Sequence, residues 1–166
     1  LTSTGNVTQA GSTSVNVSSG VTTVTATGKN ITLANTGNDF GTVVATGNNV
    51  SIKDTVNGFT VGNVTAGNLT LNAAGNIGQS VGANITTTAL DVTSTGNANL
   101  AGGTANDISG TVTGSVTGTF SLNNANTTQT QLGNISAGNL TLTSTGNVTQ
   151  AGSTSVNVSS GVTTVT

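Results

Sequence analysis

Residues 62–79 read GNVTAGNLTLNAAGNIGQ and combine the two signals that decide the fold. Leu69 and Leu71 flank Thr70, and an alternation with a period of two is typical of a β-strand, whose successive side chains point to opposite faces. Gly-Asn pairs stand on either side of this triplet and are typical of turns. The segment therefore predicts a short strand between two corners, with its apolar side chains facing inward and its hydroxyl facing outward.

The same alternation recurs along the chain and defines the predicted core. In each instance two apolar residues bracket a single residue, which is usually Thr or Ser. A helix is disfavoured because Thr and Val are β-branched and because Gly and Asn favour turns. The pattern predicts an all-β fold whose core contains Ile31, Leu33, Val50, Ile52, Phe59, Val61, Leu69, Leu71, Leu90, Val92, Phe120, Leu122, Leu140 and Leu142.

Glycines that precede similar strands set the length of the repeating unit. The spacings between Gly28, Gly47 and Gly67 are 19 and 20 residues. A unit of this length cannot bury a core alone, so successive units have to stack. Similar strands that recur one coil later can pair in parallel and in register, whereas an antiparallel sandwich needs hairpins. We therefore predict a parallel β-helix, or β-solenoid, with about 20 residues per coil.

The corners of the coils are also predicted to hold the stack together. Glycine supplies a positive φ at a corner, and asparagine tolerates one. An asparagine amide can also bond to the asparagine one coil above it. The predicted turn and ladder residues are Gly28, Asn30, Gly47, Asn49, Gly67, Asn68, Gly138 and Asn139.

A much longer repeat is superimposed on the coils. Residues 1–25 recur without a change at 142–166, an offset of 141 residues. Such identity predicts that residues 1–166 are a single solenoid segment, slightly longer than one period of a tandem array, and that both termini are cuts. One period then holds about seven coils and spans about 34 Å at about 4.8 Å per coil. Residues 62–79 also align with 133–150, so the period consists of two diverged halves.

The composition excludes several classes of function. The chain has 37 Thr, 24 Gly, 23 Asn and 17 Ser, and it lacks Cys, His, Pro, Met, Trp, Tyr and Arg. Disulfides, thiolate or imidazole metal sites and imidazole bases are therefore excluded. With two Lys against four Asp, no basic surface attracts nucleic acid or anionic lipid. No apolar run is long enough to cross a bilayer. We expect no enzyme activity, no cofactor, no nucleic-acid binding and no membrane insertion.

The strings GNVTAGNLTL, AGNIGQ, TGNVTQAG and NTGNDFGTVVATGNNVSI resemble the repeat region of filamentous haemagglutinin-like exoproteins, the large adhesins of bacterial two-partner secretion. This resemblance implies a right-handed parallel β-helix that passes through an outer-membrane secretion pore and is displayed or released at the bacterial cell surface, where it adheres or forms fibres. The secretion module of that family has no counterpart in these residues. The lack of Cys agrees independently, because a chain threaded unfolded through a pore must not carry disulfides. The expected partners are adjacent repeats and, laterally, other rods.

The four acidic residues and the two lysines have weak alternatives to a structural role. Paired carboxylates could cleave glycosides, but the aspartates are spread singly, at intervals of 15, 37 and 16 residues. Because Asp39 and Asp107 follow Asn in equivalent halves, we interpret them as turn caps. Calcium binding is disfavoured because the nonapeptide calcium repeat of other solenoids is absent. Both lysines are interpreted as exposed, with Lys53 in a weak surface pair beside Asp54.

Twelve Asn-x-Ser/Thr triplets could be glycan acceptors in a eukaryotic secreted protein. The preferred interpretation is structural, because a corner Asn followed by an inward apolar residue and an outward Thr creates the triplet automatically. The triplets begin at Asn6, Asn16, Asn30, Asn49, Asn63, Asn68, Asn84, Asn126, Asn134, Asn139, Asn147 and Asn157.

Two further functions stay open beside the surface fibre. Outward threonines such as Thr22–Thr23 and Thr86–Thr88 could form flat rows like those of ice-binding solenoids, although Val43–Val44 interrupts a regular ladder. A secreted functional amyloid is the other alternative, but its separate chains stack, whereas these coils are consecutive in one chain. Phe59 and Phe120 are predicted to stack in the core, while Phe40 could instead flank a turn.

Overall fold

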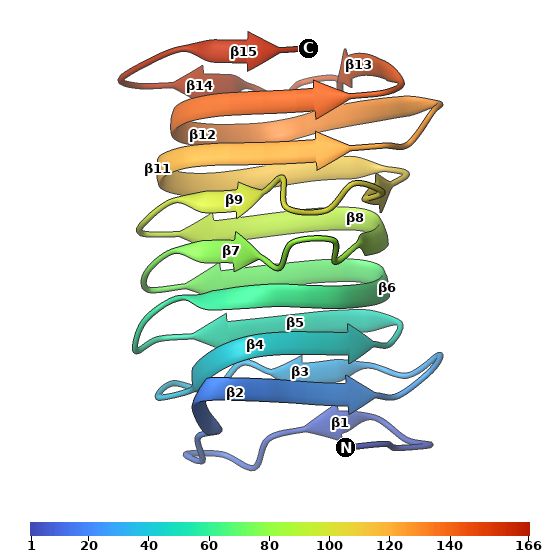
Figure 1. Ribbon diagram of the computed structural model, residues 1–166, viewed down its shortest axis with the longest axis vertical. Helices are drawn as coiled ribbons and strands as arrows, with labels where there is room; N and C mark the ends of the chain where they lie inside the picture. Colours follow the sequence, from blue (N-terminus) through green and yellow to red (C-terminus); the bar gives the residue numbers. More distant parts are fainter.

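Fifteen β-strands and no helix make up the computed structural model, which describes all residues from 1 to 166. The strands are stacked in about eight turns of about 21 residues each (Figure 1). The N-terminus lies at one end of the column and the C-terminus at the other. The strands are β1 (Val7–Thr8), β2 (Asn16–Thr25), β3 (Ile31–Leu33), β4 (Asp39–Thr46), β5 (Asn49–Asp54), β6 (Phe59–Ala73), β7 (Ile77–Gln79), β8 (Ile85–Ser94), β9 (Ala98–Leu100), β10 (Asp107–Ile108), β11 (Thr111–Asn124), β12 (Gln129–Ser144), β13 (Asn147–Gln150), β14 (Val156–Val158) and β15 (Thr163–Val165).

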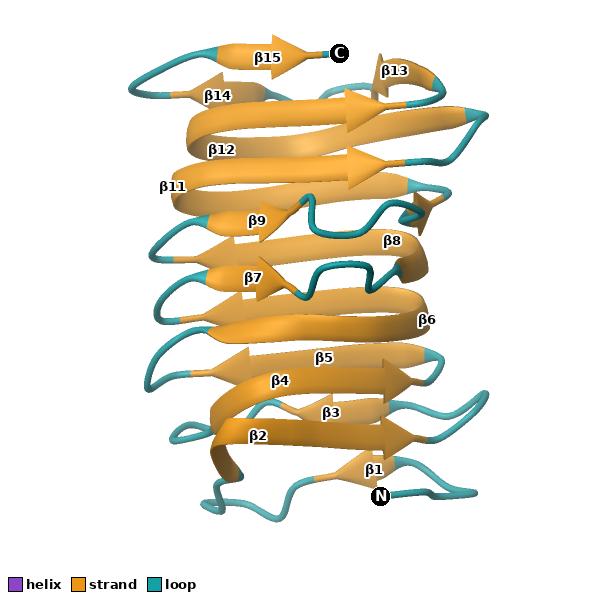
Figure 2. Ribbon diagram, in the orientation of Figure 1, coloured by secondary structure: helices purple, strands orange, loops and turns teal.

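Every strand pair is parallel, and each residue pairs with one that lies a coil further along the chain. One column of paired residues runs from Ile31 to Val50, then to Leu69 and Leu90. These steps are 19, 19 and 21 residues long. The predicted all-β parallel solenoid is therefore confirmed, with loops only along the edges of the stack (Figure 2).

The core is one continuous cluster of 33 buried apolar residues that runs along the axis. All fourteen residues of the predicted core lie in it, and none is more than 6% exposed. Phe40 is also buried, and its ring meets that of Phe59 edge to face, with centroids 6.4 Å apart. Phe40 is therefore a core residue inside β4 and does not flank a turn.

The explanation expected for three of the four glycines is wrong. Gly28 has a φ of +70°, but Gly47, Gly67 and Gly138 do not have a positive φ. A Cβ on Gly67 would lie 2.9 Å from Asn48 Oδ1, and one on Gly138 would lie 2.8 Å from the Thr117 carbonyl oxygen. These positions need glycine because the coil beneath approaches so closely that it leaves no room for a side chain.

One glycine in the interior makes room for an aromatic ring. Gly114 pairs with Val92 of the coil below, in a column of otherwise large residues. A Cβ at Gly114 would lie only 2.9 Å from Cε1 of Phe120. The ring therefore occupies volume that the side chain of a longer residue at 114 would need, and the two positions are complementary in size.

We expect Gly114→Val to lower the free energy of unfolding by about 1–3 kcal/mol, because the added methyl groups overpack the core against the ring. Adding Phe120→Leu to this variant should recover part of the loss, although Phe120→Leu alone is itself destabilising. The midpoint of thermal unfolding, followed by circular dichroism, measures both effects. Gly78→Val is the control, since the nearest atom to a Cβ at Gly78 is 3.8 Å away. Equal losses for the two glycine variants would contradict the proposed size complementarity.

Candidate functional site

The most extensively bonded polar side chain inside the column is Asn38, which is completely buried. Its Oδ1 accepts hydrogen bonds from Gln9 Nε2 at 2.7 Å and from the Val15 backbone N–H at 2.9 Å. Its Nδ2 donates to Gln9 Oε1 at 2.9 Å and to the carbonyls of Leu33 and Lys53 at 3.2 and 3.1 Å. We call this reciprocal pair of side-chain amides, Gln9 with Asn38, the first amide clasp.

A second amide clasp, Gln79 with Asn106, repeats the arrangement bond for bond. Asn106 Oδ1 accepts from Gln79 Nε2 at 2.7 Å and from the Ile85 N–H at 2.9 Å. Asn106 Nδ2 donates to Gln79 Oε1 at 3.2 Å, to the Leu100 carbonyl at 3.0 Å and to the Asn123 carbonyl at 2.9 Å. The two diverged halves of the sequence therefore share an internal polar site as well as a repeat pattern.

Each clasp joins three successive coils and fixes a loop. Gln9 follows β1, Asn38 precedes β4 one coil later, and the Lys53 carbonyl lies in β5 of the next coil. In the second clasp, Gln79 Nε2 also donates to the Ala83 carbonyl at 2.8 Å, across the loop between β7 and β8. Because these buried groups are satisfied only in one arrangement, the clasps select a single register between coils.

Asp54 forms a related buried corner, which corrects its expected pairing with Lys53. The carboxylate is completely buried, and its Oδ2 accepts from the Phe40 N–H at 2.8 Å. Its Oδ1 accepts from the N–H groups of Val56 and Asn57 at 3.0 and 2.9 Å. The weak surface pair predicted for Lys53 and Asp54 is therefore wrong, because the carboxylate faces inward and backbone N–H groups satisfy it.

Asn124 takes the matching place in the second half of the chain. It accepts from the Ile108 N–H at 2.9 Å, while its Nδ2 donates to the Ile108 carbonyl at 3.0 Å and to Thr130 Oγ1 at 2.9 Å. An amide can thus replace the carboxylate at this corner where donors and acceptors both surround it.

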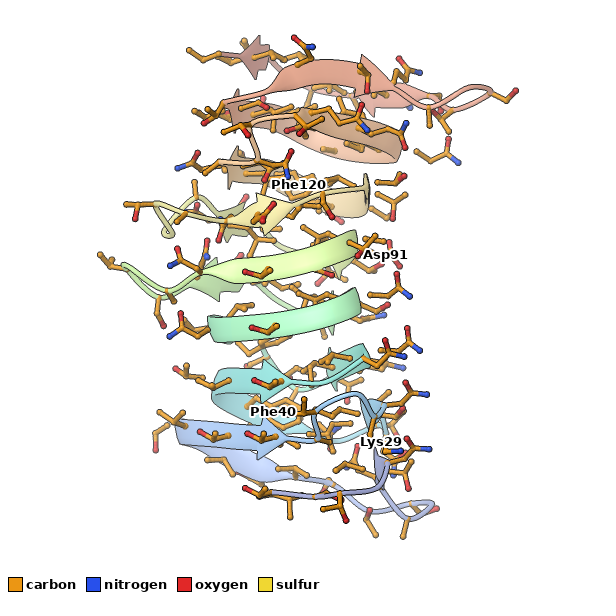
Figure 3. The ribbon with its side chains drawn as sticks, turned by 90° about the vertical axis from the view of Figure 1, so that its right-hand side faces the viewer. Lys29, Phe40, Asp91 and Phe120 are labelled. Carbon is orange, nitrogen blue, oxygen red and sulfur yellow. The ribbon has the colours of Figure 1, made fainter.

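The remaining aspartates are spread over the surface of the stack. Asp91 lies at the outer edge in Figure 3 and accepts from Thr113 Oγ1 at 2.8 Å. Asp107 is exposed and accepts from Asn126 Nδ2 at 2.7 Å. The turn-capping role interpreted for Asp39 and Asp107 is wrong, because the preceding asparagines of the two clasps make the buried bonds at these corners. No group of three His, Cys, Asp or Glu side chains is placed to hold a metal ion.

An external amide ladder runs along one edge of the column. Asn49 Nδ2 donates to Asn30 Oδ1 at 3.0 Å, and Asn68 Nδ2 donates to Asn49 Oδ1 at 2.7 Å. The structure thus brings together three of the four predicted ladder asparagines. Asn139 lies apart from them, between Thr119 Oγ1 below it and the Val162 N–H above it.

Many corner asparagines also satisfy a backbone N–H of the next coil. The acceptor is the side-chain Oδ1, and the donor lies 21 or more residues further along the chain in the examples that follow. Such bonds join Asn6 to Asn30, Asn63 to Asn84, Asn76 to Asn97, Asn84 to Ala105, Asn97 to Thr119 and Asn134 to Ser155. This use of Oδ1 as an acceptor for the coil above explains why Gly-Asn recurs at the corners.

Sequence reasoning missed the residues of both clasps and the inward corner at Asp54. A signal for the clasps was present, because TGNVTQAG and AGNIGQS each place Gln after a short strand and the Asn-Asp pair follows in each half. The outcome depended on which side chain of the Asn-Asp pair turns inward, and the alternation pattern does not decide that question.

We expect Asn106→Ala to destabilise the fold strongly, because it leaves the Ile85 N–H and the carbonyls of Leu100 and Asn123 without this partner. Each buried unsatisfied group costs about 1–3 kcal/mol. The matched control is Asn49→Ala on the exposed ladder, for which we expect a loss of about 0.5 kcal/mol or less. Chemical denaturation measures the difference, and hydrogen exchange at the Ile85 amide should accelerate only in Asn106→Ala. Similar losses for the two variants would contradict the role assigned to the clasp.

No helix in the chain is long and apolar enough to cross a membrane. Comparison with known proteins gives one match, in which residues 1–46 are similar to a family described as repeats of unknown function (DUF5649). Neither the search of curated proteins nor the search of solved structures gives a match. The matched residues include the whole 25-residue segment that recurs at 142–166, so the similarity to a repeat family agrees with the internal repetition of this chain.

Proposed function

We propose that this chain is part of an extracellular structural rod, namely a stalk or fibre repeat of a large adhesin-like protein at the bacterial surface. Its task would be adhesion, cell–cell contact or matrix formation, without catalysis. The observation that carries the proposal is the register of the repeated segment. Thr2 bonds to Thr25, and Leu142 pairs with Val165, so the paired residues are 23 positions apart in both copies. An array of such units can therefore continue along one axis without a change of register.

The local conformation of the repeated segment supports the same proposal. Ser12 and Ser153, which occupy the same place in the two copies, have φ values of 62° and 61°. The hydroxyls of Thr13 and Thr154 bond to the carbonyls of Ala10 and Ala151 in the same way. The segment thus has one preferred conformation although one copy lies at each end of the stack, which suits a modular rod.

The resemblance to filamentous haemagglutinin-like exoproteins supports the finer parts of the proposal. These parts are export through an outer-membrane pore and display at the cell surface. A chain without Cys is compatible with passage through a pore in an unfolded state. Lateral bundling of rods would use the hydroxyl and amide groups that cover the outside of the coils.

The test compares chains that contain one, two and three copies of the 141-residue unit. Electron microscopy should show rods whose length increases by about 34 Å per copy, because each coil adds about 4.8 Å. When the same chains are displayed on bacteria, cell–cell adhesion should appear and the spacing between adhering cells should increase with copy number. Display of an Asn106→Ala chain of equal length is the control for a weakened rod. Adhesion that is indifferent to the displayed chain would refute the proposed function.

One structural feature favours ice binding as a second candidate. Thr25, Thr46, Thr65 and Thr86 pair in sequence across successive coils and form an outward column that ends at Asp107. A regular column of hydroxyl and methyl groups at about 4.8 Å spacing could order water. Thermal hysteresis of the purified chain, and its loss in Thr65→Lys, would support this candidate; a freezing point equal to that of a control protein would reject it.

The secreted amyloid subunit is the remaining alternative. In that case separate chains, rather than consecutive coils, would supply the stacked strands. Growth of protease-resistant fibres after a lag that preformed seeds abolish would favour it over a rod that folds within one chain.

A further inference from the structure

The two identical segments of the chain are covered on opposite faces. In the first copy Leu1 is 72% exposed, whereas the matching Leu142 is 1% exposed. In the second copy Val148 is 38% exposed, whereas the matching Val7 is 8% exposed. The first copy therefore lacks a coil beneath it, and the second copy lacks a coil above it.

The chain itself shows what fits each open face. Beneath the second copy lies the coil that contains Leu122 and Leu140, which pair with Leu142 and Thr163. Above the first copy lies the coil that contains Ile31 and Ala45, which pair with Val7 and Val24. Because the copies are identical, each coil that covers one copy is also complementary to the other.

The open face of the first copy is an apolar hollow. It has a volume of about 330 Å³, and six of its eight lining residues are apolar: Leu1, Val15, Val17, Val21, Val24 and Leu33. In the second copy the equivalents of Leu1 and Val15, namely Leu142 and Val156, lie over Leu122 and Ile135. The hollow is therefore the unfilled position of a coil whose apolar side chains are known from the same chain.

The two copies are held with different strength. Gln9 of the first copy is clasped by Asn38, and the ten-residue strand β2 pairs with β4. The second copy is held by the short strands β13, β14 and β15, and its matching glutamine, Gln150, bonds to the Thr154 carbonyl across its own loop. The second copy is thus the one that an identical segment can displace.

We propose that a second copy of this chain binds head to tail by segment exchange. Residues 1–25 of one molecule replace residues 142–166 of another on the coil that contains Leu122, Ile135 and Leu140. Every contact in the joint then exists already within one chain: Leu1 takes the place of Leu142, and Val15 takes the place of Val156.

The exchange is favourable because it keeps the number of stacked coil interfaces and covers both open faces. Before exchange, each copy of the segment has one covered face. Afterwards a single copy has both faces covered, and the displaced segment regains its chain entropy. The proposal rests on the solenoid rod of the proposed function and adds a way for separate chains to join into one rod.

Cysteine pairs test the joint, since the native chain has no cysteine. Thr141 pairs with Thr164, and both side chains are exposed. Neighbouring strands lie about 4.8 Å apart, within the Cα separation that a disulfide spans. A chain with Thr141→Cys and Thr164→Cys is therefore locked when oxidised and cannot release its second copy. Thr46→Cys with Thr65→Cys is the matched control, because these paired residues lie far from the joint.

Analytical ultracentrifugation should show concentration-dependent oligomers for the native chain and for the oxidised control. The oxidised Thr141/Thr164 variant should lose all oligomers, and reduction should restore them. Oligomers that persist in this oxidised variant would overturn the proposal, as would a native chain that stays monomeric at every concentration. A monomer that keeps its β-sheet circular dichroism spectrum and its rod shape would refute the exchange alone and leave the proposed rod intact.

A second experiment identifies the contact directly. In the joint, Thr23 of the incoming molecule occupies the place of Thr164 and lies beside Thr141. Mixing Thr141→Cys chains with Thr23→Cys chains under oxidation should give a crosslinked heterodimer. Mixing Thr141→Cys chains with Thr70→Cys chains should not, because Thr70 lies in the middle of the column, between Ser51 and Asp91. Equal crosslinking in both mixtures would overturn the proposed register.

Discussion

Parallel backbone hydrogen bonding between consecutive coils is the constraint on which the rest of this structure depends. A coil of about 21 residues contains strands that have no partner within the coil itself. Its N–H and C=O groups are satisfied by the coil below and the coil above, and its apolar side chains are buried by the same two neighbours. Backbone pairing and burial therefore arise together as each coil is added.

Side-chain amides complete the bonding where the backbone ladder ends. On the outside, corner asparagines such as Asn30 accept an N–H from the coil above. On the inside, Asn38 and Asn106 join three coils each, and glutamines from the preceding coil complete their bonding. A backbone ladder by itself tolerates a shift of register, whereas a buried amide with five satisfied bonds does not. The clasps thus provide specificity at points where loops interrupt the strands.

The same dependence on neighbours gives the rod its possible modes of growth. A solenoid is complete along its length and incomplete at its ends, so its natural continuation is another coil. The identical segments at the two ends show both covered faces of one coil, the lower face in one copy and the upper face in the other. A surface of hydroxyl and amide groups covers the sides of the column. These features suit a structural element whose useful property is length.

Much of the fold could be predicted from the sequence, because strand alternation and coil length are local and periodic. The pairs from Ile31 and Leu33 to Leu140 and Leu142 lie in the core, since a period of two assigns each side chain to a face irrespective of its neighbours. The Asn30, Asn49 and Asn68 ladder follows from the regular spacing of the coils in the same way. Only the tertiary structure decided that Gly67 is required by a close carbonyl and amide, that Gly114 makes room for Phe120, and that Asn38 and Asp54 turn inward. These outcomes depend on which atoms the coils above and below bring within about 3 Å, and that proximity exists only after the coils have stacked.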